Sequence, residues 1–165
     1  MNQVVLGLGS NMGDSISILR EAVSRLSDFL AFVRVSSLYI TRPQDFLEQD
    51  DFYNLVVSGW TELSSREVLA LTAAIEEQLG RNRSTGIPKG PRTIDIDIAL
   101  FGSEVSKTDT LTIPHERMLV RQFVLIPLVE LLPDSADSVT GKRYRDICNS
   151  LPDQGILKVG SLYGN

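Results

Sequence analysis

The stretch TIDIDIALFG, residues 93–102, combines a strand-like apolar pattern with two carboxylates. Its β-branched and large apolar residues predict a covered strand. Successive side chains of a strand point to opposite faces, so Asp95 and Asp97 share one face, with α-carbons about 6.5–7 Å apart. Two carboxylates this close repel each other unless a cation lies between them. The alternative is an edge strand whose charges simply face solvent.

A run of cationic side chains precedes this strand in a chain whose net charge is −5. The run consists of Arg81, Arg83, Lys89 and Arg92. Mg²⁺ takes one or two carboxylates and completes its shell with water and phosphate oxygens, while basic side chains neutralise the remaining phosphate charge. The combination predicts a site for Mg²⁺ and a polyphosphate. The loop at residues 81–90 is then interpreted as a lid over a nucleotide, or otherwise as a plain connector.

Length and composition indicate one domain, residues 1–165, with 42% hydrophobic residues to build a core. The negative charge argues against nucleic-acid and acidic-membrane partners. The N-terminal sequence lacks the pattern of a signal peptide, and no apolar run approaches the roughly 20 residues that span a bilayer. Cys148 is the only cysteine, which excludes an intrachain disulfide. We therefore expect a cytoplasmic monomer that acts on small molecules.

Hydrophobic periodicity predicts the order strand, helix, strand, strand, helix, strand. The strands are expected at residues 3–8, 32–40, 54–63 and 93–101, and the helices after Asp14 or Ser15 and after Ser64. Ser64 and Glu67 form a capping box, and the second helix is expected to bury Val68, Leu71, Ile75 and Leu79. A further helix is expected at residues 122–132. This order predicts a ferredoxin-like α+β fold, an antiparallel sheet with helices packed on one face, plus C-terminal additions.

Three other features are ambiguous by themselves. The stretch GLGSNMGD, residues 7–14, lacks the lysine of a P-loop and the glycine spacing of a dinucleotide site, so we interpret it as a tight strand-to-helix turn. His115, the only histidine, follows Pro114 and is either a phosphate contact or a surface residue. Aromatic residues such as Phe52 and Phe123, with Asn54, either line a flat pocket or belong to the core.

Four blocks of the sequence resemble the 6-hydroxymethyl-7,8-dihydropterin pyrophosphokinase family of folate biosynthesis. They are GLGSNMGD (7–14), FYN (52–54), GPRTIDID with LFG (90–102), and PH followed by RQF and PL (114–128). Lys89, Ala73 and Thr110 depart from the residues common at these positions in bacterial members. The resemblance implies a ferredoxin-like fold and transfer of pyrophosphate from ATP to the hydroxymethyl group of a reduced pterin, with AMP as the other product.

The resemblance also implies a role for each candidate residue. It implies that Asp95 and Asp97 bind two Mg²⁺ ions and that Arg81 and Arg92 contact the phosphates during transfer. The further ATP contacts that it implies are Glu76, Arg83, His115 and Arg121. The pterin contacts that it implies are Thr41, Pro43, Phe52, Asn54 and Phe123.

Two alternatives remain open beside this enzyme. One is a non-catalytic ferredoxin-like module that binds a nucleotide or a metal ion, although such a module needs no pair of metal-binding carboxylates with flanking arginines. The other is an Mg²⁺-dependent transferase that acts on a different alcohol. Asn54, with Phe52 and Phe123, distinguishes the pterin enzyme from this second alternative.

Overall fold

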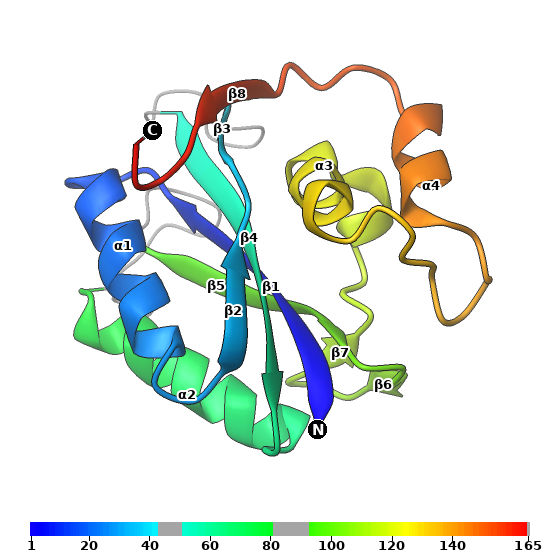
Figure 1. Ribbon diagram of the computed structural model, residues 1–165, viewed down its shortest axis with the longest axis horizontal. Helices are drawn as coiled ribbons and strands as arrows, with labels where there is room; N and C mark the ends of the chain where they lie inside the picture. Colours follow the sequence, from blue (N-terminus) through cyan, green and yellow to red (C-terminus); the bar gives the residue numbers. More distant parts are fainter. Residues whose placement is uncertain (43–50, 81–92, 165) are drawn as a thin grey trace.

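A six-stranded antiparallel sheet forms the centre of the protein (Figure 1). The computed structural model describes residues 1–42, 51–80 and 93–164. The strands of this sheet are β1 (Asn2–Ser10), β2 (Ala31–Val35), β3 (Leu38–Thr41), β4 (Phe52–Thr61), β5 (Asp95–Phe101) and β8 (Leu157–Gly160). Their order is β5-β1-β4-β3-β8, and β2 also pairs with β4. Two short strands, β6 (Ser106–Lys107) and β7 (Thr112–Ile113), form a separate small sheet.

Helices cover both faces of the large sheet in the described part of the chain. They are α1 (Ser15–Leu26), α2 (Ser65–Gln78), α3 (Gln122–Leu131) and α4 (Tyr144–Ser150), with a short 3₁₀ helix η1 (Met118–Val120) before α3. Figure 1 shows α1 and α2 on one side of the sheet and α3 and α4 on the other. The predicted ferredoxin-like α+β class is confirmed, and the C-terminal additions supply the second helical layer. None of the helices within the described residues is long and apolar enough to cross a membrane.

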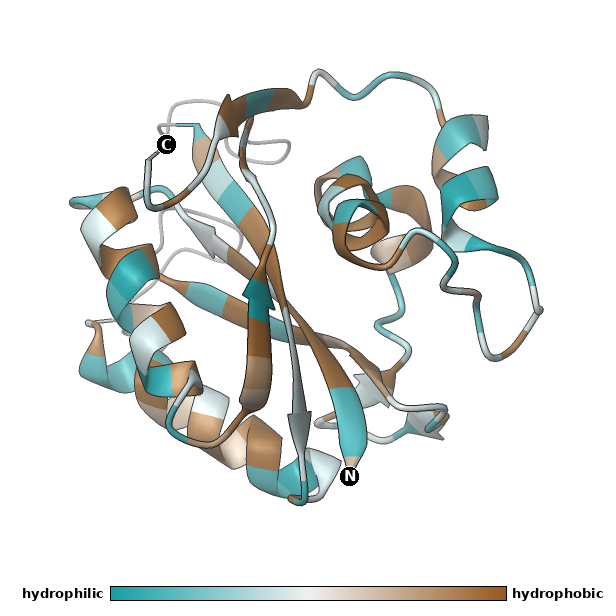
Figure 2. Cartoon of the chain, in the orientation of Figure 1, coloured by the Kyte–Doolittle hydropathy of each residue, from teal (hydrophilic) through white to brown (hydrophobic). Residues whose placement is uncertain are grey.

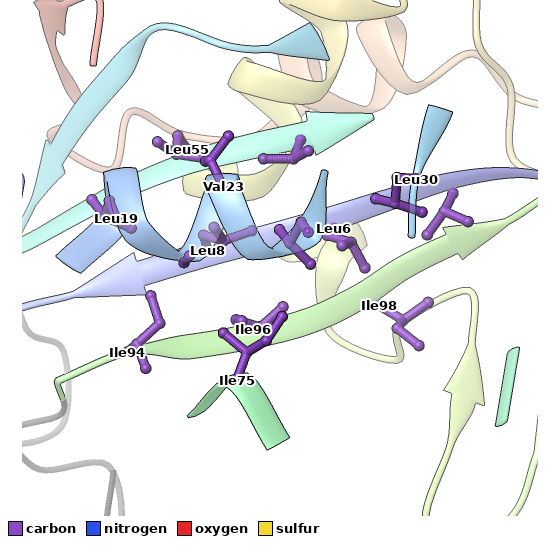
Figure 3. Close-up of a cluster of buried hydrophobic side chains, with 14 of the residues drawn as sticks. Leu6, Leu8, Leu19, Val23, Leu30, Leu55, Ile75, Ile94, Ile96 and Ile98 are labelled. Atoms are coloured by element: carbon purple, nitrogen blue, oxygen red, sulfur yellow. The ribbon is translucent and has the colours of Figure 1, made fainter. Parts of the chain in front are cut away.

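The alternation of β1 separates two apolar clusters on the two sides of the sheet. Leu6 and Leu8 point toward α1 and α2 and pack with residues such as Leu19 and Ile75 (Figure 3). Val5 points the other way, into a cluster that includes residues of α3 and α4. Figure 2 shows that α3 is apolar over most of its surface, as expected for a helix packed between the sheet and α4.

One predicted strand is interrupted. Residues 32–40 were expected to form a single strand, but β2 ends at Val35 and β3 begins at Leu38. Ser36 explains the break, because its Oγ accepts a 2.9 Å hydrogen bond from the N–H of Val56. Ser36 also donates its own N–H to the carbonyl of Val56 at 2.9 Å. A serine side chain that replaces a backbone acceptor in this way competes with a regular ladder.

The second helix was predicted correctly at its start, but one position of its buried face was wrong. Ser64 and Glu67 make both hydrogen bonds of the capping box, at 3.1 and 3.0 Å. Leu71 is exposed, and Thr72 is buried in its place. Thr72 donates its hydroxyl to the carbonyl of Leu69 at 3.0 Å, so burial leaves no polar atom unpaired.

Candidate active site

Asp95 and Asp97 lie on the same face of β5, as the alternation predicted. Ile96 and Ile98 between and after them are buried against α1 and α2, whereas both aspartates are partly exposed on the opposite face. The Asp97 side chain retains 44% of its exposure. Strand β5 therefore uses one face for the core and presents its carboxylates to solvent on the other.

Two glycines of β1 lie directly opposite the aspartates. Gly9 pairs with Asp95 and Gly7 pairs with Asp97, so all four residues share one face. A β-carbon at Gly7 would have no atom within 4 Å, which shows that the space beside Asp97 is open. Both glycines lie inside β1, which runs to Ser10, so the turn expected at residues 7–14 begins later than predicted.

Asn54 lies on the other side of Gly9, in the neighbouring strand β4. Gly9 pairs with Asn54 in one direction and with Asp95 in the other, so Gly9 separates the amide from the carboxylate. Asn54 donates Nδ2 to the Thr41 hydroxyl at 2.9 Å, and its Oδ1 is 3.0 Å from the position of a β-carbon on Gly9. Phe52 is next to them, 3.7 Å from that same position. Three of the predicted pterin residues, Thr41, Phe52 and Asn54, are therefore brought together.

His115 joins the carboxylate side of this face. The backbone N–H of His115 donates to the carbonyl of Ala99 in β5 at 3.0 Å, and this hydrogen bond anchors the segment after β7 to the strand. Nδ1 accepts a 3.3 Å hydrogen bond from the N–H of Arg117, so a neutral ring carries its proton on Nε2. Nε2 is 4.0 Å from Oδ2 of Asp97.

The charge of His115 follows from its surroundings. Burial lowers the pKa of the imidazole, and the nearby charge of Arg121 lowers it further, against the opposing effect of Asp95. The ring is thus neutral at pH 7, and its contact with Asp97 is a polar contact rather than a salt bridge. A neutral imidazole with its proton on Nε2 can donate a hydrogen bond toward the carboxylate face.

Arg121 and Phe123 lie at the start of α3. The guanidinium carbon of Arg121 is 5.3 Å from the centroid of the Phe123 ring, a cation–π distance. Arg121 is also close enough to His115 to affect its pKa. Both residues are partly exposed, so this end of α3 stays accessible beside the carboxylate face.

Glu76 has a position that the sequence did not predict. Its side chain is 2% exposed, and its Oε2 accepts a 2.8 Å hydrogen bond from the N–H of Ile96. Glu76 therefore supports β5 from α2, at the residue between the two aspartates. The nucleotide contact expected for Glu76 remains a prediction. The predicted residues Pro43, Arg81, Arg83 and Arg92, with Lys89 and the proposed lid, lie outside the described residues.

The far end of α3 is fixed to β3 and to the residue just before it. Glu130 accepts a 2.8 Å hydrogen bond from the N–H of Ser37 and a 2.5 Å hydrogen bond from the hydroxyl of Tyr39. Tyr39 pairs with Asn54 across β3 and β4. Burial and the Glu130 carboxylate raise the pKa of the Tyr39 phenol, which keeps it a hydrogen-bond donor. No pattern in the sequence predicted this link between distant segments.

The donor set of the carboxylate face fits Mg²⁺ carried by a polyphosphate. Within residues 1–42, 51–80 and 93–164, no group of three or more His, Cys, Asp or Glu side chains could hold a metal ion alone. Mg²⁺ bound to phosphates needs only one or two protein carboxylates, and Asp95 and Asp97 supply two. Paired carboxylates with a histidine and an arginine nearby suit phosphoryl-group transfer, which depends mainly on positioning and on neutralising charge.

The sequence matches the profile of one protein family. Residues 5–133 match 7,8-dihydro-6-hydroxymethylpterin-pyrophosphokinase (HPPK), and the chain belongs to this family. The predicted family and its enzyme class, the pyrophosphokinases, are therefore confirmed.

Named relatives agree with this membership. The chain is 44% identical over 134 residues to the 2-amino-4-hydroxy-6-hydroxymethyldihydropteridine pyrophosphokinase of Bacillus subtilis, covering 79% of each protein. It is 36% identical over 157 residues to the folic acid synthesis protein fol1 of Pneumocystis carinii, covering 94% of this chain but only 21% of that protein. The structure of Plasmodium falciparum HPPK-DHPS shares the fold, with a TM-score of 0.70 at 18% identity over 90% of this chain and 44% of that one.

Proposed function

We propose that this protein transfers the β,γ-pyrophosphoryl group of ATP to the hydroxymethyl oxygen of 6-hydroxymethyl-7,8-dihydropterin, with AMP as the leaving group. This reaction would place it in folate biosynthesis. Membership of the family and 44% identity to the Bacillus subtilis pyrophosphokinase support the proposal. The observation that carries it is the placement of Gly9, with Asp95 on one side and Asn54 on the other.

The arrangement around Gly9 matches the two halves of the reaction. Neighbouring strands are about 4.8 Å apart, so Asn54 and Asp95 are separated by two spacings, or roughly 10 Å. That distance suits a flat heterocycle held at Asn54 whose hydroxymethyl group extends toward the carboxylates. Gly9 itself adds no side chain that would fill the space between them.

The pterin would be bound by residues on the Asn54 side. The amide of Asn54, which Thr41 orients, would form hydrogen bonds with the polar edge of the ring. Phe52 and Phe123 would stack against its faces, and an aromatic stack contributes about 0.5–1.5 kcal/mol beyond the burial of area. Pro43 would complete the wall of this pocket.

The ATP would be bound on the aspartate side. Asp95 and Asp97 would hold two Mg²⁺ ions, which when bound would neutralise phosphate charge and lower the proton affinity of the acceptor hydroxyl. His115 would donate Nε2–H to a phosphate oxygen without adding a full charge. The remaining cations, Arg81, Arg83, Arg92 and Arg121, would neutralise the phosphates, and Glu76 would lie near the nucleotide.

Transfer of this kind depends mainly on position and charge. Little covalent assistance is required once the donor and acceptor oxygens are in line. We therefore assign Arg81 and Arg92 the stabilisation of charge on the group in transit, and the aspartates the placement of the metal ions. The substrates are small molecules, and we propose that the protein acts as a cytoplasmic monomer of one domain.

The test is an assay with ATP, Mg²⁺ and the reduced pterin, in which the nucleotide product is identified. AMP in a 1:1 ratio with the pterin diphosphate is expected. ADP instead of AMP, or AMP formed equally well with an unrelated alcohol, would indicate an Mg²⁺-dependent transferase of another kind. ATP binding without any product would indicate a non-catalytic nucleotide-binding module.

A further inference from the structure

Helix α3 begins with a residue that cannot cap it. The N-cap position is Arg121, which has an extended backbone and makes no side-chain capping bond. A guanidinium has donors but no acceptor, whereas capping requires a side-chain acceptor such as that of Ser, Thr, Asp or Asn. The first N–H groups of α3 must therefore find their partner elsewhere.

Gln154 supplies that partner from 32 residues further along the chain. Its Oε1 accepts the N–H of Gln122, the first residue of α3, at 2.9 Å. Its own N–H donates to Oε1 of Gln122 at 2.9 Å, and its Nε2 donates to the carbonyl of Val120 at 2.9 Å. Two of these three hydrogen bonds reach the backbone, at Val120 and at Gln122, and so hold it on both sides of Arg121.

Gln154 is itself held by well-anchored neighbours. Figure 1 shows the segment that carries it running from α4 to β8. Strand β8 pairs with β3, and beyond it Leu162 is buried in the core and accepts a 3.0 Å hydrogen bond from Nε of Arg20. The family match ends at residue 133, so this anchored segment lies outside it.

We propose that Gln154 is a positioning residue for Arg121 and Phe123, which lie immediately before and after Gln122. By capping Gln122, Gln154 sets the backbone from which the guanidinium and the phenyl ring project toward the carboxylate face. This inference rests on the proposed function, in which Arg121 contacts ATP and Phe123 contacts the pterin. It adds that substrate binding depends on a residue outside the family motifs.

Three variants test the role of Gln154. Gln154→Met keeps the length of the side chain but removes both the acceptor for the Gln122 N–H and the donor to the Val120 carbonyl, whereas Gln154→Glu keeps the acceptor and removes only the donor. Asp153→Ala is the matched control, because Asp153 accepts only a local hydrogen bond from Gly155 among the described contacts. The measurements are kcat, the KM for each substrate, and amide hydrogen exchange at Gln122.

We expect Gln154→Met to raise the KM for ATP, for the pterin, or for both by about fivefold or more, while kcat changes by less than about threefold. Loss of the cap should also accelerate exchange at Gln122 roughly fivefold. Gln154→Glu keeps the acceptor for the Gln122 N–H but loses the Nε2 donor to Val120, so it should restore the exchange rate at Gln122 to within about twofold and the KM values only in part. Asp153→Ala should change neither. If Gln154→Met does not fold, Gln154→Ala replaces it.

Two results would overturn the inference. One is a folded Gln154→Met variant with both KM values unchanged, even if its melting temperature is lower, because that outcome assigns Gln154 a purely structural role. The other is faster exchange at Gln122 that Gln154→Glu does not restore. Failure of the wild-type protein to form AMP would instead overturn the proposed function, and the positioning role with it, while the exchange data would still report on the cap.

Discussion

The carboxylate of Glu76 accepts a 2.8 Å hydrogen bond from the backbone N–H of Ile96, the residue between Asp95 and Asp97. Strand β5 is at the end of the sheet, so an N–H that points away from β1 has no strand to pair with. Helix α2 supplies the missing acceptor through Glu76. The edge that carries both aspartates is thereby held by a buried side chain.

Removal of this support should destabilise the protein. In Glu76→Ala the buried N–H of Ile96 loses its partner, which should cost about 1–3 kcal/mol in the free energy of unfolding. Glu76→Gln keeps an acceptor and should recover most of that loss. Urea unfolding measures the difference, with Glu77→Ala, an exposed neighbour on α2, as the control. Equal stability of Glu76→Ala and Glu77→Ala would contradict the assignment.

The two glycines of β1 should respond differently to alanine. In Gly9→Ala the new β-carbon would be 3.0 Å from Oδ1 of Asn54, so the amide must move. We expect the KM for the pterin to rise roughly tenfold, because the displaced amide would lose contacts that bind the substrate before the reaction. A β-carbon at Gly7 meets no protein atom within 4 Å, so Gly7→Ala leaves the Asn54 amide in place and serves as the control, with the KM for the pterin unchanged.

Neither glycine has a positive φ, so alanine fits the backbone at both positions. Alanine in a strand is favoured over glycine by about 0.5–1 kcal/mol, and Gly7→Ala should be slightly more stable than the wild type. Steady-state kinetics and thermal melting separate the two effects. A similar KM in both variants would argue against a pterin site at Asn54.

Loss of Asp97 should abolish activity without unfolding the protein. The side chain is 44% exposed, and burial of β5 is provided by Ile96 and Ile98 on its other face. Asp97→Ala should therefore keep the melting temperature of the wild type. Loss of a residue that only hydrogen-bonds a metal ligand typically lowers activity roughly 10–100-fold, and loss of a ligand such as Asp97 should lower turnover by more than that. The control is Asp109→Ala, at an exposed position. Full activity of Asp97→Ala would contradict the metal assignment.

The only histidine gives the protein a specific pH response. Burial first, and the charge of Arg121 second, lower the pKa of His115 in the folded state. The unfolded chain then binds a proton at a higher pH than the folded chain does, so the stability from this residue is full above about pH 6.5 and is lost as the pH falls below it. An NMR titration of the imidazole should give a pKa under about 6.5.

The variant His115→Gln isolates this contribution. It lacks the titrating group, so its stability should fall less steeply than that of the wild type between pH 6.5 and the folded-state pKa. Unfolding curves of both proteins at several pH values provide the comparison. Parallel pH profiles would show that His115 titrates alike in the folded and unfolded chains.

Local signals predicted much of the fold. Ser64 and Glu67 formed the expected capping box, and Asp14 caps α1 by accepting a 3.2 Å hydrogen bond from the N–H of Ser17. The shared face of Asp95 and Asp97 followed from strand alternation alone. These features depend on residues a few positions apart, which is why a sequence can report them.

Features that depend on distant partners were not predictable. The break at Ser36 requires Val56, and the burial of Thr72 rather than Leu71 requires the sheet that α2 packs against. Strand β8 has only four residues, LKVG, and its apolar alternation is too short to distinguish a strand from a loop. The one available signal for Gln154 was indirect, since an arginine at an N-cap predicts that another residue supplies the acceptor.

The alternation along β5 also determines which changes in chain length the protein can accept. One residue inserted between Asp95 and Ile96 would turn Ile96 and Ile98 to the face of Asp95 and turn Asp97 to the core. The β1–β5 pairing does contain one irregularity, between Val5 and Leu6, but Leu6 pairs with Ile98, so it comes after both aspartates. An insertion or deletion that misplaced the carboxylates would thus be selected against twice, through the loss of catalysis and through the loss of folding.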